Sequence, residues 1–235
     1  MKIKFQYIAI LAFLTAGMSC KKDNYKEPSS ELSGKIVYKG EAIGVENYQV
    51  PYQLYQFGFG KVGSIDGTFA QEGTYSALLF NGTYKLIIPN GQGPFKWKQL
   101  ASGAPDSTVI TLNGNQVLDL EVTPYYMIRT PQITGGSGKV TAVFKVEKII
   151  TDAANAKDIE KVYLYINKTQ FVSGAGSNNI KVAELSGAAI ADPNNISLNL
   201  AVPAIAPQTY VFGRIGLKIA GVEDLIFSPV QKVTF

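Results

Sequence analysis

The chain has 235 residues, a formal net charge of +4 and a hydrophobic fraction of 46%, which is typical of a folded protein. It contains no histidine and one cysteine, which excludes nucleophiles activated by a histidine base, histidine-ligated zinc and an internal disulfide. The charge is modest and is not gathered into a basic stripe, so nucleic acid is not an expected partner.

The first 19 residues have the layout of an export signal. Lys2 and Lys4 give a basic start, an apolar run covers residues 8–14, and the only cysteine, Cys20, follows a few small or flexible residues. The apolar run is shorter than the about 20 residues of a membrane-spanning helix. The pattern therefore predicts that residues 1–19 are removed and that a lipid on Cys20 anchors the chain to a membrane. The alternative is an ordinary signal peptide followed by an incidental cysteine.

A polar tether is expected next, over residues 20–30, because this stretch is polar and shows no period. The pattern then becomes that of β-strands, with Asn81-Gly82 predicting a tight hairpin between two of them. The strands are expected at residues 35–38, 49–59, 75–80, 83–88, 109–112 and 117–122. Several short strands separated by turn signals predict a β-sandwich domain over residues 31–124.

A second domain is expected over residues 125–235. Two prolines and a Gly/Ser cluster in residues 123–138 mark the boundary. Strands are expected at residues 139–149, 159–172, 180–185, 196–202, 210–220 and 225–235. The predicted fold class is therefore all-β, with two β-sandwiches in tandem and the second immunoglobulin- or fibronectin III-like.

Three motifs of the first domain resemble the carboxypeptidase regulatory-like, or transthyretin-like (prealbumin-like), β-sandwich. They are a glycine-led first strand, a D-G-x-F segment and a closing L-x-x-G-x-Y-x-L segment, found here at residues 34–37, 65–69 and 79–86. This resemblance implies a transthyretin-like fold for residues 31–124.

A second resemblance covers nearly the whole mature chain. Residues 20–25, 40–45, 49–60, 86–91 and 123–128 resemble a Bacteroidetes outer-membrane lipoprotein family of unknown function, whose members are typically encoded beside SusC/SusD-like glycan-uptake pairs. The resemblance implies a two-domain β protein that is lipid-anchored at the outer membrane, at the cell surface or facing the periplasm. Its implied partners are a glycan and SusC/SusD-like proteins, and it supplies no established site residues.

Aromatic side chains are the best candidates for a ligand site, because sugar rings stack on them beside hydrogen-bonding groups. Phe95, Lys96 and Trp97 follow a Gly/Pro-rich loop, and Tyr52 and Tyr55 lie in a strand rich in glutamine. The alternative is that these aromatics belong to strands and cores, where they are favoured. Tyr210, Phe212 and Arg214 share a strand face, which we interpret as structural packing.

The acids give no pattern of a catalytic pair or a metal site. Each of them is explained by a solvated turn or strand face, and no loop has the dense ligand spacing of a calcium site. We therefore expect no enzyme activity, no metal and no cofactor. Separately, Asp106-Ser107-Thr108 matches an O-glycosylation motif of exported Bacteroidetes proteins, which makes Ser107 a candidate modification site.

These observations favour a non-catalytic outer-membrane lipoprotein, an accessory glycan-binding or scaffolding component of a SusC/SusD-like polysaccharide uptake system. The first alternative is a structural surface or adhesin subunit of the fimbrial kind, which would need an exchangeable end strand. The second is a glycosidase, which would need two carboxylates converging in a cleft.

Overall fold

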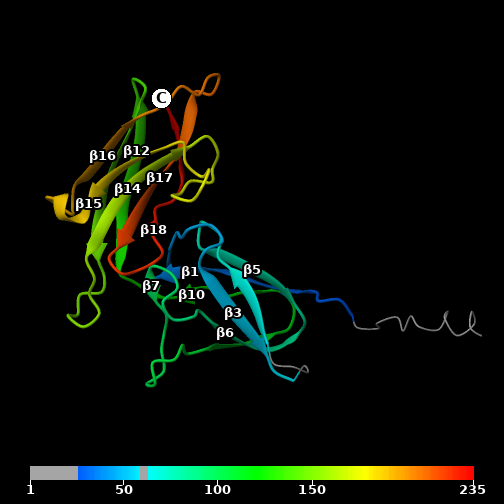
Figure 1. Ribbon diagram of the computed structural model, residues 1–235. Helices are drawn as coiled ribbons and strands as arrows, with labels where there is room; N and C mark the ends of the chain where they lie inside the picture. The colour runs from blue at the N-terminus through cyan, green and yellow to red at the C-terminus, as the bar shows by residue number, and fades with distance from the viewer. Residues whose placement is uncertain (1–25, 59–62) are drawn as a thin grey trace, which may run out of the picture.

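The protein consists of two β-domains joined end to end (Figure 1). The computed structural model describes residues 26–58 and 63–235. The expected signal peptide, Cys20 and most of the tether lie outside these residues. Two β-sandwiches in tandem confirm the predicted all-β class. Within the described ranges, no helix is long and apolar enough to span a membrane.

The first sandwich is organised around one long strand, β1 (Ser30–Tyr38). Its first half pairs with β5 (Thr74–Leu79) and β9 (Gln116–Val117), and its second half pairs with β2 (Glu41–Ala42) and β10 (Leu120–Glu121). The facing sheet has the order β4 (Ser64–Thr68), β3 (Pro51–Gln56), β6 (Gly82–Ile87), β8 (Thr108–Leu112). Fully buried side chains from both sheets, such as Leu32, Ile36, Leu54 and Leu86, fill the space between them.

Gly34 lies where β1 exchanges one set of partners for the other. An ideal Cβ at this position would lie 1.9 Å from the carbonyl oxygen of Leu118. The Leu118 N–H in turn donates to the Ser33 carbonyl at 2.7 Å. A side chain at position 34 would therefore separate the two segments, which explains the glycine in the middle of a strand.

The hairpin predicted at Asn81-Gly82 is wrong. β5 pairs with β1, whereas β6 pairs with β3 and β8, so this turn carries the chain from one sheet to the other. The side chain of Asn81 fixes the crossing, because its Oδ1 accepts hydrogen bonds from the Ser30 hydroxyl and from the Gly114 N–H. The Tyr84 hydroxyl also donates to the Phe80 carbonyl across the turn, at 2.8 Å. Turn residues predict a chain reversal, but burial on both sides of the core decides which sheet each strand joins.

The second sandwich packs a three-stranded sheet against a five-stranded one. The three-stranded sheet has the order β12 (Tyr126–Gly136), β13 (Lys139–Lys148), β16 (Ile196–Ala201). In the five-stranded sheet, β14 (Ile159–Asn167) lies between β15 (Lys181–Ser186) and β17 (Tyr210–Ile219). The other side of β17 pairs with β18 (Ile226–Phe227) and β19 (Gln231–Thr234). A 3₁₀ turn, Gly187–Ala189, follows β15.

The segment expected to be a domain boundary, residues 123–138, is mostly strand. β12 begins at Tyr126 and continues past Pro131, which has no N–H to give to a neighbouring strand. A register shift between Arg129 and Gln132 accommodates this proline as a bulge. The connection between the domains is correspondingly short. β11 (Thr123–Pro124) pairs with β7 (Phe95–Lys96), and Tyr125 alone separates β11 from β12.

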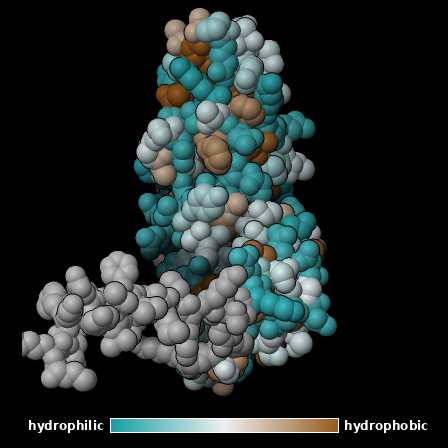
Figure 2. Space-filling model, turned by 90° about the vertical axis from the view of Figure 1, so that its right-hand side faces the viewer, coloured by the Kyte–Doolittle hydropathy of each residue, from teal (hydrophilic) through white to brown (hydrophobic). Residues whose placement is uncertain are grey.

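Contacts between main-chain groups and one buried arginine join the two domains. The Phe227 N–H of β18 donates to the Gly44 carbonyl of the first domain at 3.0 Å. Arg214 of β17 is 1% exposed, and its guanidinium lies 4.2 Å from the centre of the Phe227 ring. The structural interpretation of Arg214 thus agrees with its burial and with its stacking on the ring of Phe227. Figure 2 shows both domains as one continuous column, with apolar side chains dispersed over this face.

Candidate functional site

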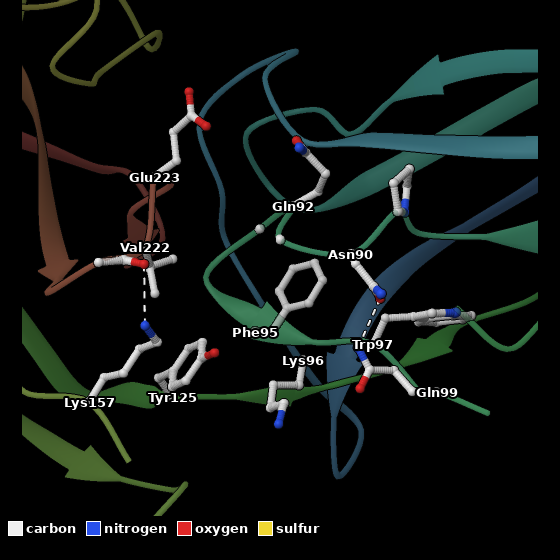
Figure 3. Close-up of a pocket in the computed structure, with 14 residues that line it drawn as sticks. Asn90, Gln92, Phe95, Lys96, Trp97, Gln99, Tyr125, Lys157, Val222 and Glu223 are labelled. Carbon is white, nitrogen blue, oxygen red and sulfur yellow. Dashed lines mark hydrogen bonds between the residues drawn. The ribbon is translucent and has the colours of Figure 1, made fainter. Parts of the chain in front are cut away.

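A cavity of about 430 Å³ lies at the junction of the two domains (Figure 3). The first domain contributes the loop after β6 and the segment around β7, and the second contributes the start of its chain, the loop before β14 and the turn after β17. Its lining residues are Pro89, Asn90, Gly91, Gln92, Gly93, Phe95, Lys96, Trp97, Gln99, Tyr125, Lys157, Gly221, Val222 and Glu223. Domain junctions are preferred places for ligand sites, and this volume lies within the usual range of about 300–1,000 Å³.

The loop of residues 89–94 is held against the second domain. The Gly93 N–H donates to the carboxylate of Asp224 at 2.8 Å. Gly93 has a φ of 78°, and a Cβ there would lie 2.4 Å from the Phe95 ring, so only glycine fits. Burial raises the pKa of Asp224 above its usual value, while the hydrogen bond from Gly93 acts in the opposite direction. This contact joins the two domains at the cavity, so both domains form its walls.

The second-domain wall is built from Tyr125, Lys157 and the turn that follows β17. The Lys157 ammonium donates to the Gly221 carbonyl at 3.3 Å and lies 5.8 Å from the centre of the Tyr125 ring. Burial raises the pKa of the Tyr125 hydroxyl above its usual value. Figure 3 shows this wall on the left and Asn90, Trp97 and Gln99 on the right, with Gln92, Phe95 and Lys96 between them.

The polar groups of the cavity suit a ligand rich in hydroxyls. The Gln99 amide donates to Asn90 Oδ1 at 2.9 Å, which fixes both amides. Within the described chain, the side chains of Gln92 and Glu223 form no hydrogen bond and are free for a ligand. Lys96 and Lys157 likewise form no ion pair with any described carboxylate. Amide, ammonium and carboxylate groups beside aromatic rings can bind sugar hydroxyls and cover a sugar's apolar face.

The acids of the cavity bear on the glycosidase alternative. Glu223 is the only acid among the lining residues, whereas glycosidases use two carboxyl groups on opposite sides of the scissile bond. The described residues also contain no group of three or more side chains placed to hold a metal ion. The arrangement is suited to binding.

The structure brings the three predicted residues Phe95, Lys96 and Trp97 to this cavity, but not as an open platform. Phe95 is 4% exposed and Trp97 is 6% exposed. The indole N–H of Trp97 donates to the Asp106 carbonyl at 2.6 Å, which holds the ring within the core. The burial of both rings favours the alternative that they belong to the core, where they fill the end of the first sandwich. These residues form a wall of the cavity, and ligand binding by them stays a prediction.

The other predicted platform is not part of the cavity. Tyr52 is 3% exposed, packs against Phe69 and Tyr75, and donates its hydroxyl to the Ser76 carbonyl. This burial favours the alternative that Tyr52 belongs to the core, and ligand binding by Tyr52 stays a prediction. Tyr55 points to the opposite face of β3, where its hydroxyl donates to Gln53 Oε1 at 2.9 Å.

Ser107 lies half-buried just before β8, and its carbonyl accepts a hydrogen bond from the Lys98 ammonium. Its modification stays a prediction.

Sequence reasoning missed most of the residues that complete the cavity. Tyr125, Lys157 and Glu223 come from three separate segments of the second domain. Two signals were present, namely the Gly/Pro-rich loop of residues 89–94 and the turn that begins at Gly221. Neither pattern indicates that the two segments meet, because their contact depends on how the domains are joined.

Two family models match the chain in succession. The model described as "Protein of unknown function (DUF3823) N-terminal domain" matches residues 30–123. The model described as "Domain of unknown function (DUF3823_C)" matches residues 126–232. No curated protein matches the sequence.

Solved structures of three Bacteroidetes proteins resemble the whole two-domain unit. A DUF3823 family protein from Parabacteroides merdae is 30% identical with a TM-score of 0.76, and the match covers 89% of this chain and 100% of that one. A DUF3823 family protein from Bacteroides ovatus is 28% identical with a TM-score of 0.75, and the match covers 88% of this chain and 99% of that one. A third protein, from Bacteroides uniformis and described as a "putative carbohydrate binding protein", is 18% identical with a TM-score of 0.66, with coverages of 88% and 100%. At that identity, the third likeness shows the fold alone.

Proposed function

The chain belongs to the DUF3823 family, and we propose that it is an outer-membrane lipoprotein that binds a glycan, without catalysis, in the cavity between its two domains. In this proposal Cys20 carries the lipid, and the protein serves as an accessory glycan-binding or scaffolding component of a SusC/SusD-like uptake system. Anchoring would keep the bound glycan near the transporter and raise its local concentration there.

The observation that carries the proposal is the composition of the cavity between the domains. It combines aromatic walls from Phe95 and Tyr125 with the free polar ends of Gln92 and Glu223. Two lysines and one glutamate give it a small net charge, which suits a neutral sugar better than a polyanion. The description of the Bacteroides uniformis protein as a "putative carbohydrate binding protein" adds support.

The positions of the terminal strands favour this function over that of a fimbrial subunit. A subunit assembled by strand exchange needs an end strand that its own domain can give up. Here β1 is the centre of a five-stranded sheet, and β19 pairs with β17 along Gln231–Thr234. Removing either strand would expose the core of its own domain.

Glycan arrays followed by isothermal titration calorimetry test the proposal. The wild-type protein should bind at least one neutral glycan, and Gln92→Ala and Glu223→Ala should each weaken that binding about tenfold, the effect of losing one or two hydrogen bonds. Both side chains are free of hydrogen bonds within the described chain, so the fold should be unaffected. Tyr55→Ala is the matched control, because Tyr55 lies on a different face, and it should bind as wild type does. Failure of the wild-type protein to bind any glycan would refute the proposal.

A further inference from the structure

A second cavity, of about 270 Å³, lies beside the first along the same short strand, β7. Lys96 and Trp97 line both cavities. The remaining lining residues of the second cavity are Lys98, Glu121, Val122, Thr123, Ile150, Asp152 and Asn155. Like the first, it draws its walls from both domains, since Ile150, Asp152 and Asn155 belong to the second.

A single flexible side chain connects the domains where the two cavities adjoin. The Lys96 ammonium donates to Asn155 Oδ1 at 2.5 Å. Asp152 orients this amide, because its carboxylate accepts from Asn155 Nδ2 at 2.7 Å and from the Asn155 N–H at 3.1 Å. The amide oxygen is thereby turned toward Lys96. This contact is a single hydrogen bond, so a ligand that offers its own acceptor to the ammonium can displace the lysine from Asn155.

The second cavity has the same mixture of groups as the first. Val122, Ile150 and Trp97 provide apolar surface, while Thr123, Asp152 and Glu121 provide hydroxyl and carboxylate groups. We infer that the two cavities are consecutive subsites of one groove, and that the groove takes a linear oligosaccharide whose chain crosses β7 beside Lys96. This inference rests on the proposed function and specifies its ligand as an oligosaccharide longer than either cavity alone can hold.

Chain-length dependence of binding tests the inference. Calorimetric titration of the full mature protein would use a size series, from mono- to hexasaccharide, of the glycan identified on the array. Affinity should rise with length beyond what the first cavity accommodates, and then level off. Thr123 is exposed and pairs with Lys96 across β7 and β11, so Thr123→Trp should fill the second cavity without disturbing a core. This variant should bind the long oligosaccharides about tenfold more weakly and the short ones unchanged, whereas Thr123→Ser should match wild type at every length.

Asn155→Ala should change the affinity for long oligosaccharides in the opposite direction. Without the amide, the lysine need not be displaced, so long oligosaccharides should bind roughly fivefold more tightly. An affinity that does not depend on length, or a Thr123→Trp protein that binds long chains as wild type does, would overturn the inference while leaving the proposed function intact. Absence of binding at every length would refute the proposed function and the inference with it.

Discussion

The guanidinium of Arg214 donates a 2.5 Å hydrogen bond to the main-chain carbonyl of Gln71, which lies in the other domain. The same group also donates to the carbonyls of Val45, Val172 and Ser228, so four carbonyl groups hold this one side chain. Burial lowers the pKa of Arg214 to about 10, which leaves it charged at neutral pH. A charged side chain surrounded by carbonyl oxygens fixes one domain against the other, and the cavity between them is therefore formed before any ligand arrives.

The first prediction concerns this arginine. Arg214→Met keeps much of the side chain's volume but leaves the buried carbonyl of Val45 without its donor, and leaves the Gln71 carbonyl with only the hydrogen bond from the Val45 N–H. We expect a loss of about 3 kcal/mol in the free energy of unfolding, as is typical when one partner of a buried charged contact is removed. Urea titration monitored by circular dichroism measures it.

Arg129 offers a matched control, because it also joins the domains. It forms ion pairs with Glu41 of the first domain and Glu147 of the second, but its side chain is 30% exposed. Arg129→Gln should change the free energy of unfolding by no more than about 1 kcal/mol. Equal effects of Arg214→Met and Arg129→Gln would contradict the account of the interface.

The second prediction concerns Trp97. Because its ring is buried and its N–H is bonded to the Asp106 carbonyl, Trp97→Ala should cost about 3–5 kcal/mol of stability, as for other large-to-small core changes. Trp97→Phe should recover much of the stability. Chemical denaturation of the two variants measures whether Trp97→Phe is more stable than Trp97→Ala. A Trp97→Ala protein as stable as wild type would show that the ring is not part of the core.

The third prediction concerns the pH dependence of the contact between Asp224 and Gly93. Burial raises the pKa of Asp224 in the folded protein, so the folded state binds its proton more tightly than the unfolded state. The contribution of Asp224 to the free energy of unfolding therefore falls as the pH rises from the unfolded pKa of about 3.9 through the raised folded pKa. Asp224→Asn keeps an oxygen acceptor for the Gly93 N–H and removes the buried charge.

We expect Asp224→Asn to melt of order 2 °C above wild type at pH 7, which corresponds to less than about 1 kcal/mol. The difference should vanish as the pH falls below the unfolded pKa, where both side chains are neutral. Differential scanning calorimetry from pH 3.5 to pH 7.5 measures this. A variant that melts below wild type at pH 7 would mean that the carboxylate charge stabilises the contact.

The fourth prediction concerns the anchor. The mature protein should begin at Cys20 carrying a diacylglyceryl group, which mass spectrometry of the N-terminal peptide detects. Cys20→Ser should release the chain from the membrane fraction, since one cysteine is the only candidate for the lipid. An unmodified Cys20 in a protein that still sediments with membranes would contradict this anchor.

The sequence predicted the features that depend on local pattern. Period-two alternation located the strands that form both cores, for example Val140, Ala142 and Phe144 of β13, all of which are buried. The sequence also shows that the candidate residues Phe95, Lys96 and Trp97 follow a Gly/Pro-rich loop, and in the structure this loop and these residues line the cavity between the domains.

The features that depend on distant contacts could not be predicted in this way. Asn81-Gly82 reverses the chain as expected, but the strands on its two sides join different sheets. Arg214 shares a face with Tyr210 and Phe212, yet its carbonyl partners come from segments up to 169 residues away. The aromatic rings of Tyr52 and Trp97 could belong to a surface or a core, and only the packed sandwich decides between the two.

The central claim is that the cavity between the domains holds the glycan. A crystal structure of the mature protein with its best-binding oligosaccharide tests this most directly. The account predicts sugar density in contact with Phe95, Tyr125 and Glu223 of the cavity, with the domain arrangement unchanged. Sugar bound at another surface, such as the face of β3 that carries Tyr55, with the cavity empty, would contradict it.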